Sequence, residues 1–273
     1  MTIAATSRAP YWTTYRGAAA ENYERFFVPV IPRPLAEDLV KDAGLRPDER
    51  ILDVACGTGV VARLAAERLG EHGSVSAVDV NAGMLAVARS IASDAKVRID
   101  WYETPAERMP LPDESFDVAF CQLGLQFITD KAAALRDIHR VLVPGGRLLV
   151  NMPAPTPFWN VMDQAFEKHL PTGVNFVRLV FSLNDPAVVE RLFRDAGFRE
   201  VSVRRGTRKI HLPPPRDFLW QYVHSTPLAG TISEMDRELL EALEQDTAKG
   251  WQPWIEGDDM TYDQPMLYAF GQK

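Results

Sequence analysis

The chain has 273 residues, of which 46% are hydrophobic and 25% charged, with 17 glycines and 20 prolines. This mixture is typical of a folded globular protein and excludes disordered, coiled-coil and collagen-like chains. The start of the chain is polar, and no apolar stretch reaches the ~20 residues of a membrane helix, so we expect no stable membrane insertion. The net charge of -7 argues against a sequence-independent nucleic-acid binder, and together these features predict a cytoplasmic protein.

Short apolar runs alternate with helical patterns between residues 50 and 152. The apolar runs predict strands over 50–55, 74–78, 97–102, 116–121 and 147–152. The helical periodicity between them predicts helices over 59–69, 82–93 and 130–142, the last of which ends before the turn Pro144-Gly145-Gly146. Strands separated by helices of this length indicate a parallel sheet with helices on both faces.

The remainder of the chain is less regular. We expect a helix over 185–196 capped by Asn184 or Asp185, a strand from 198 to 203 that continues towards 211, mainly helix over 216–250, and a closing strand over 266–270. The predicted fold is therefore α/β, a doubly wound, mostly parallel seven-stranded sheet with a helical N-terminal segment and helical inserts. We predict a lid segment over 1–45, an α/β domain over 46–212 and 264–273, and a helical cap over 213–263; a further insert covers 153–183.

The most informative stretch is Ile51-Leu52-Asp53-Val54-Ala55-Cys56-Gly57-Thr58-Gly59-Val60-Val61-Ala62, which follows a strand and opens a helix. Glycines at this position allow a tight turn and a close approach of a ligand to the backbone. Asp79 lies 20 residues beyond Gly59, at the end of the second strand, where a carboxylate binds the hydroxyls of a ribose. The glycine spacing alone also fits a dinucleotide-binding loop.

Asp53 distinguishes a dinucleotide, which contains a pyrophosphate, from a cofactor that contains a ribose and an ammonium group. A carboxylate beside the loop repels a pyrophosphate, whereas it accepts hydrogen bonds from an α-ammonium group. S-adenosylmethionine has an ammonium group, a ribose diol and no phosphate. The sequence therefore favours this cofactor, with S-adenosylhomocysteine as its product, and the alternative that Asp53 merely caps the turn becomes weaker when Asp79 is considered as well.

The chain resembles the class I S-adenosylmethionine-dependent methyltransferases, in particular the ubiquinone and menaquinone-biosynthesis branch. Four motifs carry this resemblance in order. They are Asp53-x-x-Cys56-Gly57-Thr58-Gly59, Val78-Asp79-x-Asn81-x-x-Met84-Leu85, Ala106-Glu107-x-x-Pro110-x-x-Asp113-x-Ser115-Phe116-Asp117, and Arg140-Val141-Leu142-x-Pro144-Gly145-Gly146. The resemblance covers about residues 20 to 155, and more loosely 180 to 210.

The resemblance implies a set of cofactor-binding residues. The glycine loop and Asp53 would hold the methionine end, Asp79 the ribose, and the segment from Thr104 to Glu107 the adenine. The implied set is Tyr23, Asp53, Ala55, Cys56, Gly57, Thr58, Gly59, Asp79, Val80, Met84, Pro105, Ala106, Glu107, Cys121, Gln122 and Gln126. No metal site is expected, because two cysteines are too few for a cysteine-rich centre.

The adenine segment departs from the family pattern. Thr104-Pro105-Ala106 stands where relatives have Gly-Asp-Ala, so the usual acidic partner of the adenine amino group is Pro105. Proline has neither a side-chain acceptor nor a backbone donor. The Ala106 amide, a backbone carbonyl or Glu107 would then have to bind the adenine.

Methyl transfer is an in-line displacement that needs orientation and exclusion of water, and it needs a base only where the acceptor must lose a proton. His211 and His224 flank the triple proline Pro213-Pro214-Pro215 where the chain enters the predicted cap, and both are candidates for such a base, although a structural role is favoured for each of them. Gln126 stands where many relatives have His. An amide is no base at neutral pH but can orient an oxygen of the substrate, so Gln126 favours catalysis by proximity.

Aromatic residues are concentrated outside the predicted sheet. They are Tyr11, Trp12, Tyr15, Tyr23, Phe26, Phe27, Phe158, Trp159, Trp220, Tyr222, Trp251 and Trp254. They either pack a cap onto the sheet or form an apolar pocket for a flat or lipophilic acceptor, with Tyr23 on a closing lid. Four basic residues after Phe198, at 204, 205, 208 and 209, are explained by protection of a sheet edge, or alternatively by an acidic substrate or RNA.

These features predict an enzyme that transfers a methyl group from S-adenosylmethionine to oxygen, carbon or nitrogen of a small, apolar or aromatic metabolite. A methyltransferase acting on tRNA or protein and a catalytically silent binder of the cofactor are the alternatives, and a nicotinamide enzyme is a more distant one. The intact Asp53, glycine loop and Asp79 permit cofactor binding in the first three cases. The sequence leaves the acceptor and the oligomeric state open, a homodimer included.

Overall fold

The computed structural model describes residues 18–92, 97–170 and 176–273. The aromatic residues Tyr11, Trp12 and Tyr15 lie outside the described residues. Within the described ranges, no helix is long and apolar enough to cross a membrane.

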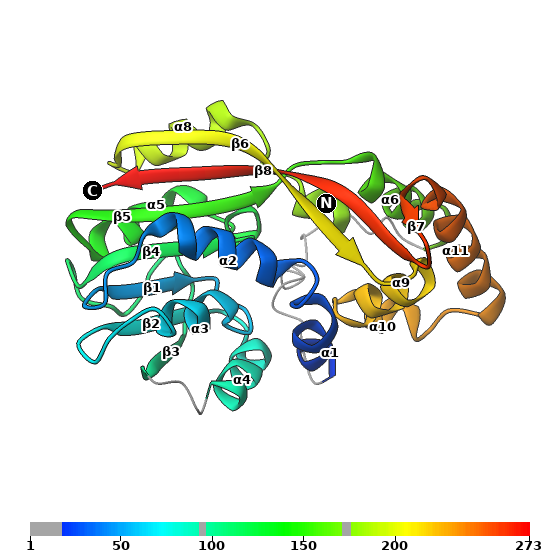
Figure 1. Cartoon of the computed structure of the whole chain (residues 1–273), viewed down its shortest axis with the longest axis horizontal. Helices are drawn as coiled ribbons and strands as arrows, with labels where there is room; N and C mark the ends of the chain where they lie inside the picture. Colours follow the sequence, from blue (N-terminus) through cyan, green and yellow to red (C-terminus); the bar gives the residue numbers. More distant parts are fainter. Residues whose placement is uncertain (1–17, 93–96, 171–175) are drawn as a thin grey trace, which may run out of the picture.

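One sheet of eight strands runs through the molecule in the order β3-β2-β1-β4-β5-β8-β6, and β7 pairs only with β8 (Figure 1). Strands β1 to β5 pair in parallel, whereas β8 is antiparallel to both β5 and β6. The predicted mostly parallel, doubly wound sheet is confirmed. The strands are β1 (Arg50–Val54), β2 (Ser74–Asp79), β3 (Ile99–Glu103), β4 (Phe116–Gln122), β5 (Leu142–Pro153), β6 (Arg199–Leu212), β7 (Ile255–Glu256) and β8 (Asp259–Gln272).

Helices cover both faces of the sheet. Buried side chains of α2, α3 and α4 form one apolar cluster with β1 and β2, and those of α5 and α8 form another on the opposite face. In chain order the α-helices are α1 (Ala18–Asn22), α2 (Pro32–Ala43), α3 (Val60–Ala66), α4 (Ala82–Ile91), α5 (Lys131–Val141), α6 (Pro157–His169), α7 (Phe176–Val180), α8 (Pro186–Asp195), α9 (Pro215–His224), α10 (Leu228–Ile232) and α11 (Arg237–Gly250). A π-helix, η2 (Tyr23–Phe27), and two 3₁₀ turns, η3 (Leu125–Phe127) and η4 (Gln252–Trp254), complete the set.

Local sequence signals begin the helices where the structure has them. The side chains of Asp130 and Asp185 accept hydrogen bonds from backbone amides in the first turns of α5 and α8. Thr156 does the same for α6, and proline occupies the first helical position of α6 and α8. The predicted cap of α8 is therefore Asp185, and Gly197, with φ 102°, follows the helix.

The last strands are longer than predicted. β5 already begins at Leu142 and includes the predicted turn Pro144-Gly145-Gly146, because Leu142 pairs with Phe116 before a register shift. β8 begins at Asp259 rather than at Met266, because β6 continues to Leu212 and pairs with it along this whole length. The strands β6 and β8 thus extend as a pair beyond the rest of the sheet.

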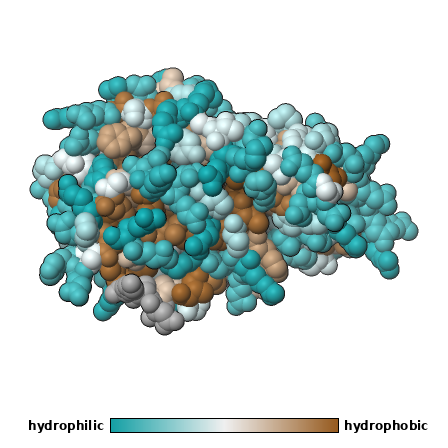
Figure 2. Space-filling model, in the orientation of Figure 1, coloured by the Kyte–Doolittle hydropathy of each residue, from teal (hydrophilic) through white to brown (hydrophobic). Residues whose placement is uncertain are grey.

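The extended ends of β6 and β8 enter a second, helical lobe formed with α6, α9, α10 and α11 (Figure 1). Phe158 on α6 is its central side chain, stacked on Trp251 at a ring-centroid distance of 5.0 Å and on Tyr262 of β8 at 4.1 Å. The outer end of this lobe is mostly hydrophilic in Figure 2. The large aromatic residues of this lobe therefore pack in its interior.

The strand β6 forms one edge of the sheet, and its basic residues contact acidic residues nearby. Arg204 pairs with Asp42 and Arg208 pairs with Asp38 at 3.2 Å, both on α2. These pairs lay charged side chains along an exposed edge strand, which opposes edge-to-edge association. The observed position supports the edge interpretation of this basic stretch.

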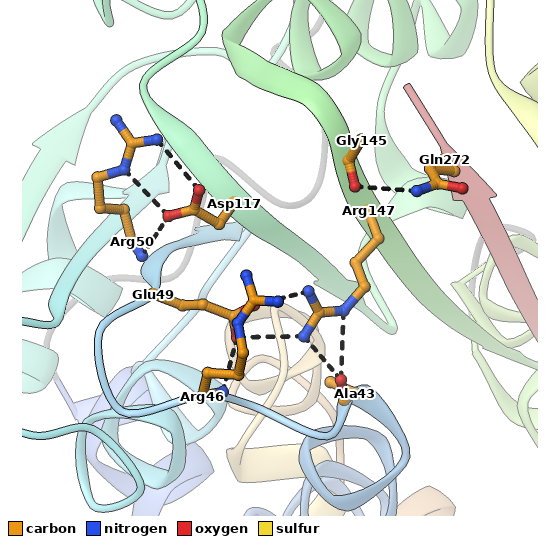
Figure 3. A network of polar contacts seen from close by, with 8 residues as sticks. All are labelled: Ala43, Arg46, Glu49, Arg50, Asp117, Gly145, Arg147 and Gln272. Carbon is orange, nitrogen blue, oxygen red and sulfur yellow. Dashed lines mark hydrogen bonds and ion pairs between the residues drawn. The ribbon is translucent and has the colours of Figure 1, made fainter.

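A polar network fixes the amino ends of the central strands (Figure 3). Glu49 is 1% exposed and accepts hydrogen bonds from the Arg147 guanidinium on β5, at 2.8 and 3.1 Å. Arg147 also donates to the carbonyl of Ala43 at the end of α2. Burial acts to raise the pKa of Glu49, but the hydrogen bonds from Arg147 and from the Arg46 amide outweigh it and lower the pKa.

We predict that Glu49→Gln destabilises the fold strongly. The substitution leaves the half-buried Arg147 guanidinium without its counter-charge, which costs on the order of 3 kcal/mol in the free energy of unfolding. Because the pKa of Glu49 is lowered on folding, its contribution is present above the ordinary carboxyl pKa and is lost as pH falls through the folded value.

Urea unfolding at pH 7 and pH 4 measures this effect. Glu37→Gln is the matched control, because Glu37 forms an exposed i,i+4 pair with Arg33 and is worth less than about 0.5 kcal/mol. Equal losses in the two variants would show that the network of Figure 3 does not hold the strands.

Candidate functional site

A cavity of about 410 Å³ opens at the carboxyl ends of the parallel strands. It lies where the strand order reverses, because β1 has β2 on one side and β4 on the other. The loops that follow β1 and β4 lead to helices on opposite faces of the sheet, which leaves a crevice between these loops. One end of the cavity is lined by segments that follow β1, β2 and β3, and the other by helices and β8.

The loop between β1 and α3 requires both of its glycines. Gly57 and Gly59 have φ values of 56° and 81°, a region that side chains other than glycine rarely adopt. A Cβ at Gly57 would meet no atom within 4 Å, whereas one at Gly59 would lie 2.4 Å from the Trp101 ring. Between them, the buried hydroxyl of Thr58 has no hydrogen-bond partner, although Thr58 lines the cavity.

Asp53 lies at the floor of the cavity, near the end of β1. It is 1% exposed, and its Oδ2 accepts a hydrogen bond of 2.9 Å from the Ala62 amide in α3. Burial raises the pKa of Asp53 to about 8, and the charge of Asp79 adds to the effect against the hydrogen bond from Ala62. A cationic group placed beside Asp53 would therefore favour its ionised form.

Asp79 ends β2 on the same side of the cavity. One carboxylate oxygen accepts from the Gly57 amide and the other from the Asn81 amide, both at 2.8 Å. Burial raises the pKa of Asp79 even though these backbone hydrogen bonds oppose the shift. The side chain is thus fixed in orientation beside the glycine loop.

The segment after β3 forms the next part of the lining. The Thr104 amide donates to the Asp79 carbonyl at 3.0 Å, which joins this segment to the end of β2. Pro105, Ala106 and Glu107 all line the cavity, with Pro105 exposed and Ala106 buried. Because Pro105 is a proline, it offers the cavity neither a polar side chain nor a backbone N–H.

The opposite end of the cavity has a wall of aromatic rings, which we call the aromatic wall. It consists of Phe27, Phe127, Trp159, Phe181, Tyr222 and Tyr262. Phe27 and Tyr222 meet edge to face at a centroid distance of 5.7 Å, and the rings of Trp159 and Tyr222 lie 5.3 Å apart. Burial raises the pKa values of Tyr222 and Tyr262 well above the ordinary value, so both hydroxyls keep their protons.

The polar atoms of this wall bind one another. The indole N–H of Trp159 donates to Gln264 Oε1 at 2.9 Å and lies 3.1 Å from the Tyr262 hydroxyl, which in turn lies 3.3 Å from the same Gln264 oxygen. Gln264 Nε2 donates to the carbonyls of Ala154 and Pro265. These bonds fix the rotamers of three neighbouring lining residues.

Two glutamines at the end of β4 stand between the two ends of the cavity. Gln122 Nε2 donates to the Pro32 carbonyl at 2.9 Å, and its Oε1 accepts from Asn151 at 3.3 Å. Gln126 is 1% exposed and its Nε2 donates to the Leu123 carbonyl at 2.9 Å, whereas its Oε1 is buried and has no partner among the described residues. This oxygen is therefore a buried acceptor that receives no hydrogen bond from the described part of the chain.

Tyr23 lines the cavity from the π-helix η2, beside Asp79. Burial raises the pKa of its hydroxyl, and the charges of Glu24 and Asp79 raise it further. Glu24 pairs with Arg63 of α3 at 2.7 Å, which holds η2 against the helix that follows the glycine loop. Single π-helical turns are rare in proteins, and those that occur often lie at functional sites.

The structure brings together most of the predicted cofactor residues, and all of them except Gly59 and Cys121 line the cavity. Gly59 packs against Trp101 instead. Cys121 is fully buried on the other face of β4, because successive residues of a strand point in opposite directions and Gln122 points to the cavity.

The two candidate histidines are not brought to the cavity. His211 is exposed between the buried Ile210 and Leu212, and its Nδ1 lies 3.2 Å from the Thr261 hydroxyl. His224 is exposed at the end of α9. We therefore assign no role in proton transfer to either residue.

Sequence reasoning missed Phe127, Phe181, Tyr262 and Gln264. Tyr262, Gln264 and Met266 are alternate residues and would have been placed on one strand face, had the last strand been extended towards Asp259. Phe127 and Phe181 follow from no local signal, because each belongs to a short irregular segment.

Known proteins have similar sequences. A family model described as "Methyltransferase domain" matches residues 51–146. The ubiquinone/menaquinone biosynthesis C-methyltransferase UbiE of Proteus mirabilis is 33% identical over 188 residues, which cover 63% of this chain and 74% of the relative. That of a Shewanella species is 40% identical over 187 residues with the same coverage. The match to UbiE of Xanthomonas oryzae, 43% identical over 113 residues, spans 45% of the relative's length and 41% of this chain.

Solved structures agree with the fold. Phosphoethanolamine N-methyltransferase 2 of Haemonchus contortus, in complex with S-adenosyl-L-methionine, superimposes with a TM-score of 0.60 at 21% identity and covers 93% of this chain and 56% of that one. A SAM dependent methyltransferase from Aquifex aeolicus gives 0.52 at 20% identity, covering 70% and 92%. The sheet and the site define a class I methyltransferase fold. The chain belongs to the family of S-adenosylmethionine-dependent methyltransferases that includes the ubiquinone/menaquinone biosynthesis C-methyltransferases.

We predict that Gly57→Ala and Gly59→Ala differ in their cost. Each loses about 1–2 kcal/mol in the free energy of unfolding from a side chain in the left-handed region. Gly59→Ala loses about 1–3 kcal/mol more, because its new Cβ must displace the Trp101 ring. Urea unfolding of the two variants measures the difference, and a loss at Gly59 no larger than that at Gly57 would contradict this packing.

Proposed function

We propose that this protein transfers a methyl group from S-adenosylmethionine to a small, apolar or aromatic metabolite bound against the aromatic wall. When bound, the cofactor supplies a methyl group on a positively charged sulfur. The observation that carries the proposal is that one cavity joins two chemically different ends, with Asp53, Asp79 and the glycine loop at one end and the aromatic wall at the other. Two ligands can therefore meet inside a single cavity.

The lining residues fit this cofactor. The buried, unpartnered Thr58 hydroxyl and the open space above Gly57 leave polar groups and room at the methionine end. Asp53 suits an ammonium group and Asp79 suits a ribose diol, because both are buried hydrogen-bond acceptors. Thr104, Pro105 and Ala106 would border the adenine through backbone atoms and apolar contact.

The protein would contribute orientation and exclusion of water. Gln122 is held by Pro32 and Asn151, and Trp159 by Gln264 and Tyr262, so the residues between the two ends keep fixed positions. Fixed positions lower the entropic cost of bringing two reactants into line. The enclosed apolar wall would keep water from the reacting groups.

Among the residues that the structure describes, the lining offers no general base near neutral pH at the acceptor end. Tyr222 and Tyr262 keep their protons, and Gln122, Gln126 and Gln264 are amides. This supports acceptors that are nucleophilic without help from the protein. A methyltransferase acting on a macromolecule is less favoured, because a concave, mostly apolar cavity of about 410 Å³ suits a small acceptor.

Titration calorimetry with S-adenosylmethionine and S-adenosylhomocysteine tests the cofactor site. We expect binding by the native chain and a loss of tenfold or more for Asp79→Asn, which is about 1.4 kcal/mol. Glu190→Gln, at an exposed ion pair on α8, is the control and should bind like the native chain. Absence of binding to the native chain would refute the proposal, whereas binding without turnover of any acceptor would favour a silent binder.

The affinity should also depend on pH. An ammonium group binds the ionised form of Asp53, whose pKa is about 8 in the free protein, so binding below this pH must release a proton. The affinity is therefore expected to rise by up to tenfold per pH unit from pH 6 towards pH 8 and then to fall, because the α-ammonium group of the ligand itself loses its proton at higher pH. Calorimetry in buffers of different ionisation enthalpy counts the protons released. The Asp53→Asn variant should lose both this release and much of its affinity, and a native affinity that is constant from pH 6 to 8 would contradict the role of Asp53.

A further inference from the structure

We propose that the acceptor end of the cavity binds an uncharged molecule that donates a hydrogen bond to Gln126 Oε1, and that it excludes carboxylates and phosphates. This inference rests on the proposed function and concerns the chemical class of the acceptor. It follows from three features of the lining, which are its charges, its satisfied polar groups and one unsatisfied oxygen.

The charges of the lining exclude anions. Among the described residues, the lining contains no lysine, arginine or histidine, whereas Asp53, Asp79 and Glu107 all belong to it. An anionic acceptor would lose its hydration inside the cavity without gaining a counter-charge, and it would face carboxylates. A cationic acceptor would be repelled by the positively charged sulfur of the cofactor, and an amine protonated at the reacting nitrogen would in addition lack the lone pair that accepts a methyl group.

Nearly all polar groups at the acceptor end already have partners within the protein. Trp159, Tyr262 and Gln264 bind one another, and Gln122 bonds to Pro32 and Asn151. The Thr226 hydroxyl donates to the Val223 carbonyl. A ligand therefore gains little by replacing these bonds.

Gln126 is the exception. Its amide orientation is fixed because Nε2 donates to the Leu123 carbonyl, which leaves Oε1 as a buried acceptor without a donor. Leaving such a group unpaired is costly, and a hydroxyl or N–H of a ligand would remove the cost. Gln126 lies next to Phe127 of the aromatic wall, so a ring that packs there can carry the donor.

Discrimination by such a group is asymmetric. A buried acceptor built to receive a hydrogen bond rejects an analogue without the donor more strongly than an apolar pocket rejects a change of size. The geometry thus gives Gln126 a positioning role towards the acceptor. This role depends on a hydrogen bond to Oε1 and involves no change in the protonation of the side chain.

The test measures binding of three probes of similar size to the chain saturated with S-adenosylhomocysteine. They are 4-ethylphenol, which is uncharged and has a donor, 4-ethylanisole, which lacks the donor, and 4-ethylbenzoate, which is an anion. Calorimetry at pH 7 should show 4-ethylphenol binding at least fivefold more tightly than either of the others. In Gln126→Met, which keeps the length of the side chain but removes its amide, 4-ethylphenol and 4-ethylanisole should bind alike.

Gln164→Met on the exposed face of α6 is the matched control and should keep the native preference. Equal binding of 4-ethylphenol and 4-ethylanisole to the native chain, binding of 4-ethylbenzoate as tight as that of 4-ethylphenol, or binding of none of the three would overturn the inference. Each of these outcomes leaves the cofactor site intact if S-adenosylhomocysteine binds. Failure of S-adenosylhomocysteine itself to bind would instead refute the proposed function. The preference of the native chain decides the matter even if Gln126→Met does not fold.

Discussion

The antiparallel pairing of β6 and β8 is the constraint on which the rest of the site depends. The two strands pair continuously from Ser202 with Phe270 to Leu212 with Met260, so they extend rigidly beyond the parallel strands. This extension reaches into the helical lobe (Figure 1). It brings Tyr262 and Gln264 into the same cavity as the residues that follow β1 and β4. Without it, the crevice at the strand reversal would have only the cofactor side, which is open to water.

The two ends of the cavity follow different physical rules. At the end formed by β1 to β3, buried carboxylates with raised pKa values are held by backbone amides and suit cationic and hydroxyl groups. At the other end, aromatic rings lie around polar groups that satisfy one another. The first end suits a cofactor that is charged and polar, and the second suits an acceptor that gives up little hydration.

The parts of this structure that could be predicted from sequence are those set by local signals. The strands 50–54 and 74–79, the glycine loop and the caps of the helices depend on neighbouring residues, so periodicity and turn chemistry identify them. The aromatic wall depends on segments that lie far apart in the chain, such as Phe27, Trp159 and Tyr262. The packing of η2, α6 and the extended β8 brings them together, and the predicted closing strand was too short to include Tyr262.

The errors at single residues have the same origin. His211 was a reasonable candidate for a base by its place in the chain, but the alternation of β6 turns it to the solvent between Ile210 and Leu212. Cys121 likewise points away from the cavity because Gln122 points towards it. A shift of one residue along a strand decides whether a side chain belongs to the core, the site or the surface.

The N-terminal segment links the two ends of the cavity mechanically. The Asn22 side chain donates to the carbonyl of His224 in the helical lobe, while Glu24 pairs with Arg63 on the α/β side. Arg63 also donates to the carbonyl of Thr58 in the glycine loop. Tyr23 and Phe27, which line the cavity, are therefore held between the cofactor loop and the aromatic wall. The same short segment therefore contacts the glycine loop, through Glu24 and Arg63, and the helical lobe, through Asn22.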